Sequence, residues 1–149
     1  MIEGSTHPQT SIATAVGFLS SLYAITFFSG ALLHLGVRLP LGFSVLTESR
    51  ILPATIVESL CGLALALGAF AVLTSMSRAW TVAFAAHAFS LGSVLLGMGA
   101  LAVGAGPSTE LNTIYHRVML VALAAVLALL LSPAGRTALS GTRRISGRE

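Results

Sequence analysis

Residues 52–75 read LPATIVESLCGLALALGAFAVLTS, a stretch in which Glu58 is the only charged residue. A helix needs about 20 such residues to cross roughly 30 Å of hydrocarbon. Three further apolar stretches of comparable length lie at 11–37, 79–104 and 112–132. A transmembrane β-barrel would instead need short strands in which apolar and polar residues alternate. The sequence therefore predicts four transmembrane helices.

The composition of the whole chain agrees with that prediction. The protein has 149 residues, of which 55% are hydrophobic and only 9% are charged, and its mean hydropathy is +0.91. Soluble domains carry about 25% charged residues. We predict an all-α integral membrane protein built as a four-helix bundle with almost no soluble mass. It has a short N-terminal tail (1–10), a bundle (11–132) and a basic flexible C-terminal tail (133–149).

The arginines predict the orientation, because cytoplasmic loops retain positive charge. Arg78 lies between the second and third stretches, and the C-terminal tail is also rich in arginine. The opposite side holds fewer arginines, partly offset by glutamates. Residues 1–10 contain Glu3 and no Lys or Arg, so the first stretch is expected to be a permanent span and not a signal peptide. We expect both termini in the cytoplasm, with the protein in a bacterial inner membrane.

The connections between the spans differ in length. Residues 75–78 leave room only for a tight turn, so the second and third spans should form an antiparallel hairpin. The connection at 38–51, RLPLGFSVLTESRI, is half apolar and contains Pro40 and Gly42 as helix breakers. It is expected to lie on the membrane surface or to fold over the bundle as a lid. Small residues in the second and third spans predict tight helix packing with little interior volume.

Three histidines and one glutamate interrupt the apolar spans. Such residues are costly in hydrocarbon and usually face the bundle interior or a wet cavity. With a rise of about 1.5 Å per residue, His34, Glu58 and His116 are predicted to form one layer, roughly 5–10 Å from the outer boundary. His87 starts from the inner side and lies deeper. Its expected role is an interhelical hydrogen bond, with contact to a quinone as a second role.

The predicted layer has more than one chemical interpretation. Two imidazoles and a carboxylate are a common ligand set for zinc and non-haem iron, and imidazole pairs also bind haem. His34, Glu58 and His116 are therefore candidate metal ligands, although no short-spaced pair enforces their geometry. Alternatively, Glu58 is neutral or hydrogen-bonded and the two histidines are interface anchors at headgroup level. The outer face has three further candidate residues, which are Tyr115, Arg117 and Glu110. We expect little direct pairing between Arg117 and Glu110.

One segment also resembles a known family. The stretch ILPATIVESLCGLALALGAF at 51–70 resembles the second helix of the DoxX-type membrane proteins, where a glutamate is followed by glycines four and ten residues later, here Glu58, Gly62 and Gly68. FFSGALLHLG at 27–36 is similar to that family's first helix. His34 stands where the family often has lysine, and the basic residue usual after the second glycine appears only at Arg78. The resemblance covers about half of the chain. It implies a small four-helix bundle linked to quinone-dependent oxidation or to membrane oxidoreductase assemblies.

These observations leave several classes of function. We expect first a small accessory or anchoring subunit of a larger membrane assembly, whose partners are membrane lipids and other membrane subunits or a second copy of the chain. The alternatives are a DoxX-like redox or quinone-interacting protein and a metal- or haem-binding bundle; a transporter is more distant. The possible cofactors are haem, quinone or a divalent metal. No nucleotide-binding loop, nucleophile elbow or zincin motif is present, so a stand-alone enzyme and a nucleic-acid partner are not expected.

Overall fold

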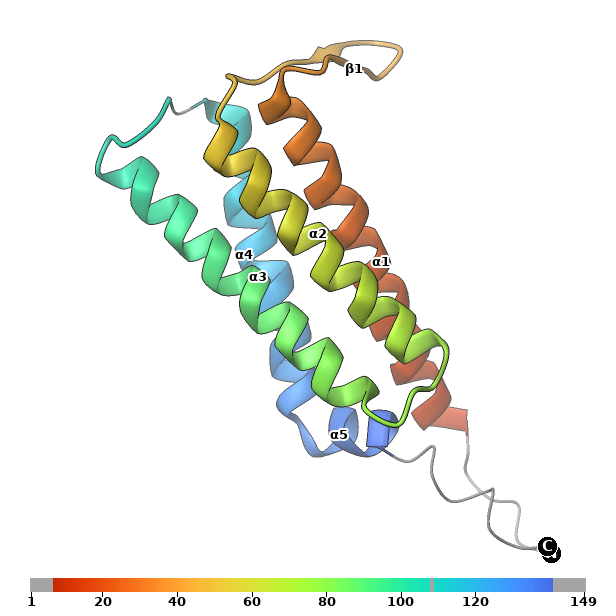
Figure 1. The fold of residues 1–149 in the computed structure, drawn as a ribbon. Coiled ribbons are helices and arrows are strands. Elements are labelled where there is room, and N and C mark those ends of the chain that lie inside the picture. The colour runs from red at the N-terminus through yellow and green to blue at the C-terminus, as the bar shows by residue number, and fades with distance from the viewer. Residues whose placement is uncertain (1–6, 108, 141–149) are drawn as a thin grey trace, which may run out of the picture.

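Four long helices form the body of the protein. The structure is a computed structural model that describes residues 7–107 and 109–140. The helices α1 (His7–Leu35), α2 (Leu52–Leu73), α3 (Ala79–Ala102) and α4 (Glu110–Leu131) run up and down beside one another (Figure 1). Each is long and apolar enough to cross a membrane. The predicted four helices of membrane-crossing length are therefore confirmed, with ends that shift by a few residues.

The helix ends explain where the chain reverses. Gly36, with φ of 95°, follows α1, and the N–H of Val37 donates to the carbonyl of Leu32 at 3.0 Å. Gly104, with φ of 73°, follows α3 in the same way. This left-handed conformation suits glycine, which has no Cβ to clash with the backbone. It stops each helix and turns the chain toward its next element.

Two apolar clusters hold the helices together. One lies nearer the middle of the bundle and joins all four helices through Phe27, Leu65, Val94 and Leu123, among others. The other, which we call the α5-end cluster, comprises Val16, Val72, Ala79, Ala83, Val126, Leu130 and Leu139. Because burial from water does not drive helices together within lipid, close packing of these side chains is the main attraction between them.

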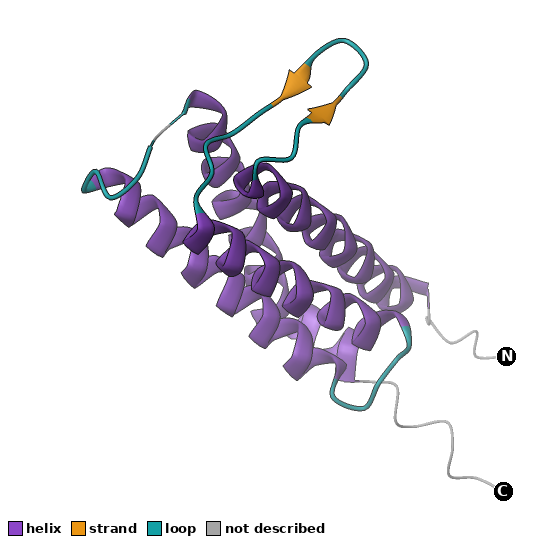
Figure 2. Ribbon diagram, turned by 45° about the horizontal axis from the view of Figure 1, so that its top comes forward, coloured by secondary structure: helices purple, strands orange, loops and turns teal. Residues whose placement is uncertain are grey.

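A small β-hairpin connects α1 to α2. Its strands β1 (Leu39–Pro40) and β2 (Val45–Leu46) pair antiparallel, and the turn contains Gly42 with φ of 84°. Figure 2 shows the hairpin extending beyond the helices at one end of the bundle. Phe43 at the turn is 89% exposed, whereas Leu46 points back into a cavity. The connection therefore has several exposed apolar residues, whereas Leu46 faces the interior.

A fifth helix, α5 (Pro133–Ser140), closes the opposite end of the bundle (Figure 1). The Ser132 hydroxyl accepts a hydrogen bond from the N–H of Gly135 at 3.1 Å, and Leu139 is buried in the α5-end cluster. The prediction of a flexible tail from residue 133 is thus wrong for 133–140, because one serine cap and one buried leucine dock this segment. The predicted N-terminal tail is likewise shorter, because α1 begins at His7. Residues 1–6 and 141–149 lie outside the described residues.

Candidate functional site

An ion pair between two helices lies within the predicted membrane layer. His34 comes from the last turn of α1 and Glu58 from the second turn of α2, about 9 Å along that helix. The His34 Nε2 lies 3.9 Å from the Glu58 Oε1. The two residues are only 3% and 5% exposed. A polar pair this deep is costly in hydrocarbon, which makes it a candidate for function.

Gly30 makes room for the glutamate. A Cβ at position 30 would lie 2.9 Å from the Glu58 Oε2 and 3.1 Å from its Oε1, closer than packed atoms normally approach. Gly30 precedes His34 by four residues, so both lie on the face of α1 that meets α2. This role of Gly30 was not predicted from the sequence. The available signal in the sequence was a glycine four residues before a histidine near the end of a span, which puts both on one face of the helix.

The backbone fixes the protonation pattern of His34. Its Nδ1 lies 3.1 Å from the carbonyl oxygen of Ser49, next to β2. A carbonyl oxygen can only accept, so Nδ1 carries the hydrogen and donates it. In the neutral ring the Nε2 facing Glu58 is then free to accept a proton. The pair can hold one proton, on Glu58 or on His34, with no net charge in either case.

Three residues of α4 complete the polar cluster. The side chains of Tyr115 and Glu58 are near enough to interact. The Tyr115 hydroxyl and the Glu58 Oε2 are nevertheless buried without a hydrogen-bond partner among the described residues. The His116 Nδ1 lies 2.8 Å from the carbonyl oxygen of Asn112. His116 is also near enough to His34 for their charges to interact. The outer part of the bundle interior is therefore polar.

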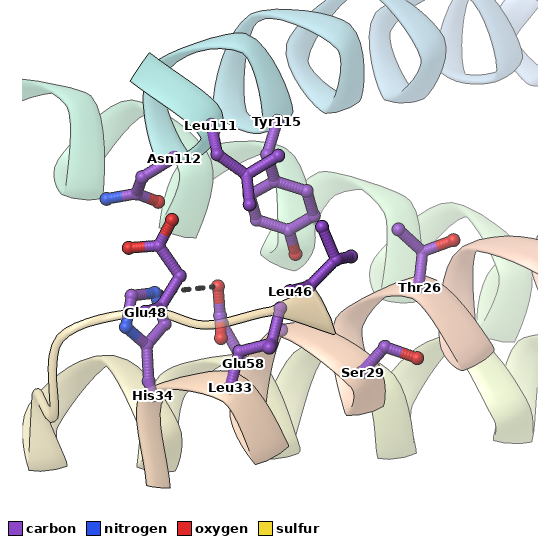
Figure 3. Close-up of a pocket in the computed structure, with 11 residues that line it drawn as sticks. Thr26, Ser29, Leu33, His34, Leu46, Glu48, Glu58, Leu111, Asn112 and Tyr115 are labelled. Atoms are coloured by element: carbon purple, nitrogen blue, oxygen red, sulfur yellow. Dashed lines mark ion pairs between the residues drawn. The ribbon is translucent and has the colours of Figure 1, made fainter. Parts of the chain in front are cut away.

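A small cavity, which we call the hairpin cavity, lies between α1, α4 and the connection at 36–51. This connection contains β1 and β2, and we call it the hairpin segment. Its volume is about 170 Å³. Figure 3 shows Glu48, Glu58 and Tyr115 projecting into it from three different elements. At its rim the Thr109 hydroxyl donates to the Glu48 Oε1 at 2.6 Å. That bond connects the hairpin segment to Thr109, the residue that caps the start of α4.

A larger cavity, the helix groove, lies on the other side of the pair. Its volume is about 520 Å³, and residues of α2 and α3 form most of its lining. His34, Glu58 and Asn112 line both cavities, and His116 adds a fourth polar group to the groove. The His34–Glu58 pair thus stands between two hollow spaces. The groove is open on one side, so it does not test the prediction of little interior volume; Gly97 and Gly106 are among its lining residues.

The other predicted site residues lie apart from the pair. His87 is fully buried, but its Nδ1 bonds to the carbonyl of Ala83 at 2.8 Å in the same helix, so the predicted interhelical hydrogen bond is not formed. His87 lines neither cavity. Glu110 and Arg117 are exposed and, in the part of the chain that the structure describes, do not form an ion pair with each other. Of the outer-face candidates, only Tyr115 points into the site.

The histidines and Glu58 do not form a metal site in this geometry. Among residues 7–107 and 109–140, no three His, Cys, Asp or Glu side chains are placed to hold a metal ion. His34 and Glu58 come together as a pair. His116 instead lines the groove beside Gly97, where an added Cβ would lie 3.1 Å from the His116 Nε2. A ligand set of two imidazoles and one carboxylate is therefore not assembled.

Sequence reasoning missed three polar residues of this site. Glu48 and Thr109 lie in connections, and their contact depends on how the hairpin segment folds. Asn112 precedes His116 by one helical turn, which is the only local signal that it would face the same interior. No family model, no curated protein and no solved structure matches the chain, so any function must be argued from the site itself.

Proposed function

We propose that the protein binds a small amphipathic molecule of the quinone class inside the membrane, at the hairpin end of the bundle. The observation that carries this proposal is the helix groove of about 520 Å³ that ends on His34 and Glu58. Pockets for small ligands commonly measure about 300–1,000 Å³ and combine apolar walls with a few polar groups. The volume of the groove falls in that range, and its lining combines apolar walls with a few polar groups.

The chemistry of the pair suits a quinone headgroup. A quinone carbonyl needs a hydrogen-bond donor, and a quinol hydroxyl also needs an acceptor. Glu58 donates when it holds the shared proton and accepts when His34 holds it. Leu96, on the wall of the groove, is 77% exposed, so an apolar tail has a way out toward lipid. The DoxX resemblance favours a quinone over other amphipathic molecules.

Binding can be measured with the protein in lipid nanodiscs and a short-tailed benzoquinone or naphthoquinone as the probe. Ala54 lines the groove, and Ala54→Phe should fill it and weaken binding by about tenfold or more. Ala125→Phe is the matched control, because Ala125 is exposed on α4 and lines neither cavity. The proposal fails if the parent protein takes up no more quinone than empty nanodiscs, or if Ala54→Phe binds like the parent.

The protein is also proposed to work beside other membrane subunits or a second copy, as a small accessory component. The favouring observation is how little of α3 and α4 is covered by the rest of the protein. In the most apolar 18-residue stretch of each helix, 28% of α3 and 22% of α4 are buried, against 50% of α1 and 44% of α2. These open faces need lipid or a protein partner. Purification in mild detergent should yield a stoichiometric partner or a dimer. A monomer that carries only lipid would contradict the proposal.

The orientation belongs to the same proposal, with both termini in the cytoplasm of a bacterium and the hairpin outside its inner membrane. The start of α1 and the α2–α3 turn with Arg78 lie at the same end of the bundle as α5 (Figure 1). The excess of arginine at that end supports a cytoplasmic location. Reporters fused after Glu149 and near Arg78 should read as cytoplasmic, and one near Ser108 as external. The reverse pattern would place the site at the cytoplasmic face.

A further inference from the structure

We propose that the hairpin cavity is a water-filled inlet through which the His34–Glu58 pair exchanges a proton with the solution on the hairpin side of the membrane. This inference goes beyond ligand binding in the helix groove, because proton exchange needs only the pair and the smaller cavity. The two cavities would then have separate tasks. The groove opens toward lipid, and the hairpin cavity opens toward water.

Unpartnered polar atoms are the first reason to place water in the hairpin cavity. The Glu58 Oε2 and the Tyr115 hydroxyl are buried without a hydrogen-bond partner, and both residues line this cavity. Buried polar groups nearly always bond to protein or to ordered water. One water needs only about 10–15 Å³ of cavity space and two or more polar partners. The cavity, at about 170 Å³, has room for several waters.

The position of the cavity is the second reason. Its lining runs from Glu58, within the predicted membrane layer, to Leu46 and Glu48 of the hairpin segment, outside the helices. Figure 3 shows the carboxyl groups of Glu48 and Glu58 entering the same space. Glu48 is only half-buried, so it lies between the solution and the interior. A carboxylate at this point attracts protons toward the cavity.

The groups that surround Glu58 decide where a proton can go. α3 packs against α2 but contributes no ionisable side chain to either cavity. The ionisable groups that face or adjoin Glu58 are His34 of α1, Glu48 of the hairpin segment, Cys61 of α2, and Tyr115 and His116 of α4. Of these, only His34 makes an ion-pair contact with the carboxyl group among the described residues.

The proton transfer balances without any further reactant. Water in the cavity gives a proton to Glu58 and takes back the proton that the pair already holds, so one proton replaces another and neither hydroxide nor a charged pair is left behind. The proton that stays can reside on Glu58, which is then a neutral acid. The same proton can also reside on the Nε2 of His34, leaving a carboxylate beside an imidazolium, while Nδ1 keeps its own hydrogen on the Ser49 carbonyl. Both arrangements have zero net charge. A neutral pair avoids the large cost of an isolated charge in hydrocarbon.

Hydrogen–deuterium exchange at the carboxyl group tests the inlet directly. Infrared spectra of the reconstituted protein should show a carboxylic acid C=O band that disappears in Glu58→Gln. After transfer into D₂O, the rate at which this band shifts reports how readily water reaches Glu58. Leu46→Trp fills the hairpin cavity and should slow the shift by about tenfold, which corresponds to about 1.4 kcal/mol.

Two control variants separate this inference from ligand binding. Leu41→Trp adds the same bulk to an exposed hairpin position that lines neither cavity, and it should leave the exchange rate unchanged. Ala54→Phe should weaken quinone binding without slowing exchange, because it fills only the groove. The inlet is refuted if Leu46→Trp exchanges as fast as the parent, or if Leu41→Trp slows exchange equally. It is also refuted if no Glu58 acid band appears at any pH.

Discussion

The two ends of this bundle are built in opposite ways. At the α5 end, Leu130 and Leu139 are buried in an apolar cluster, and the indole N–H of Trp80 donates to the Leu130 carbonyl at 2.8 Å. At the hairpin end, Glu58 and Tyr115 have buried polar atoms without partners beside two cavities. Among the described residues, the α5 end thus carries an apolar cluster and a hydrogen-bonded indole, and the hairpin end carries two cavities and unpartnered polar atoms. We therefore expect stability to depend mainly on the first end, and the proposed ligand and proton chemistry to lie at the second.

The largest effect on stability is expected in the α5-end cluster. Leu130 is fully buried, so Leu130→Ala should lower the free energy of unfolding by about 2–5 kcal/mol, through lost packing contacts and the cavity left behind. Denaturant titration in mixed micelles measures this change. Leu63→Ala, at an exposed position of α2, should change stability by no more than about 0.5 kcal/mol. Equal losses in the two variants would show that this end is not specially packed.

The hairpin end should respond in the opposite sense. Glu58→Leu replaces a buried, incompletely bonded acid with an apolar side chain, and a neutral imidazole at His34 then leaves no unpaired charge in the interior. We expect the unfolding free energy not to fall, while quinone binding weakens by about tenfold or more. Glu58→Gln keeps the shape of the side chain and tests the acidic proton alone. A Leu variant that no longer folds would show that the pair is structural and would remove the contrast between the ends.

A moderate effect is expected where the indole of Trp80 holds α4. Trp80→Phe keeps a ring able to stack on Phe84 but loses the hydrogen bond to the Leu130 carbonyl, at a cost of about 0.5–1.5 kcal/mol. Arg136 lies 5.3 Å from the centre of the Trp80 ring, and Arg136→Gln should cost less than about 1 kcal/mol. Thermal unfolding of both variants ranks the two contacts. A larger loss from Arg136→Gln would reverse our view of how α5 is held.

The smallest effect should come from the bond between the hairpin segment and α4. Glu48→Ala removes the acceptor of the Thr109 hydroxyl at the bundle surface, so the unfolding free energy should change by less than about 0.5 kcal/mol. Backbone amides of the hairpin, including that of Leu41, should nevertheless exchange faster, because local opening is easier than global unfolding. Unchanged amide exchange would mean that the hairpin is held by its contacts with α1 alone.

The helices themselves were predictable from the sequence. The four apolar stretches matched the observed helices because a span in hydrocarbon must satisfy its own backbone, whatever its neighbours are. The burial of Glu58 inside the bundle was predictable for a similar reason, since an acid in an apolar stretch is costly where it faces hydrocarbon. The depth of His34 and Glu58 followed from the helical rise, and the structure places the two side chains 3.9 Å apart.

Other features depended on how the helices meet. His87 bonds to its own helix, Gly30 yields space to Glu58, and Glu48 reaches Thr109 across the bundle end. The His87 bond lies within one helix and takes the place of the predicted interhelical bond. The other two contacts depend on the rotation and separation of two elements, so spacing along one segment does not predict them. The two cavities arise for the same reason: volume left between helices is a property of their packing. The sequence by itself determined four apolar helices of membrane-crossing length and an acid within one of them. Only the tertiary structure decided that this acid lies between a groove lined mostly by α2 and α3 and a cavity under the hairpin, because such spaces depend on how the helices pack.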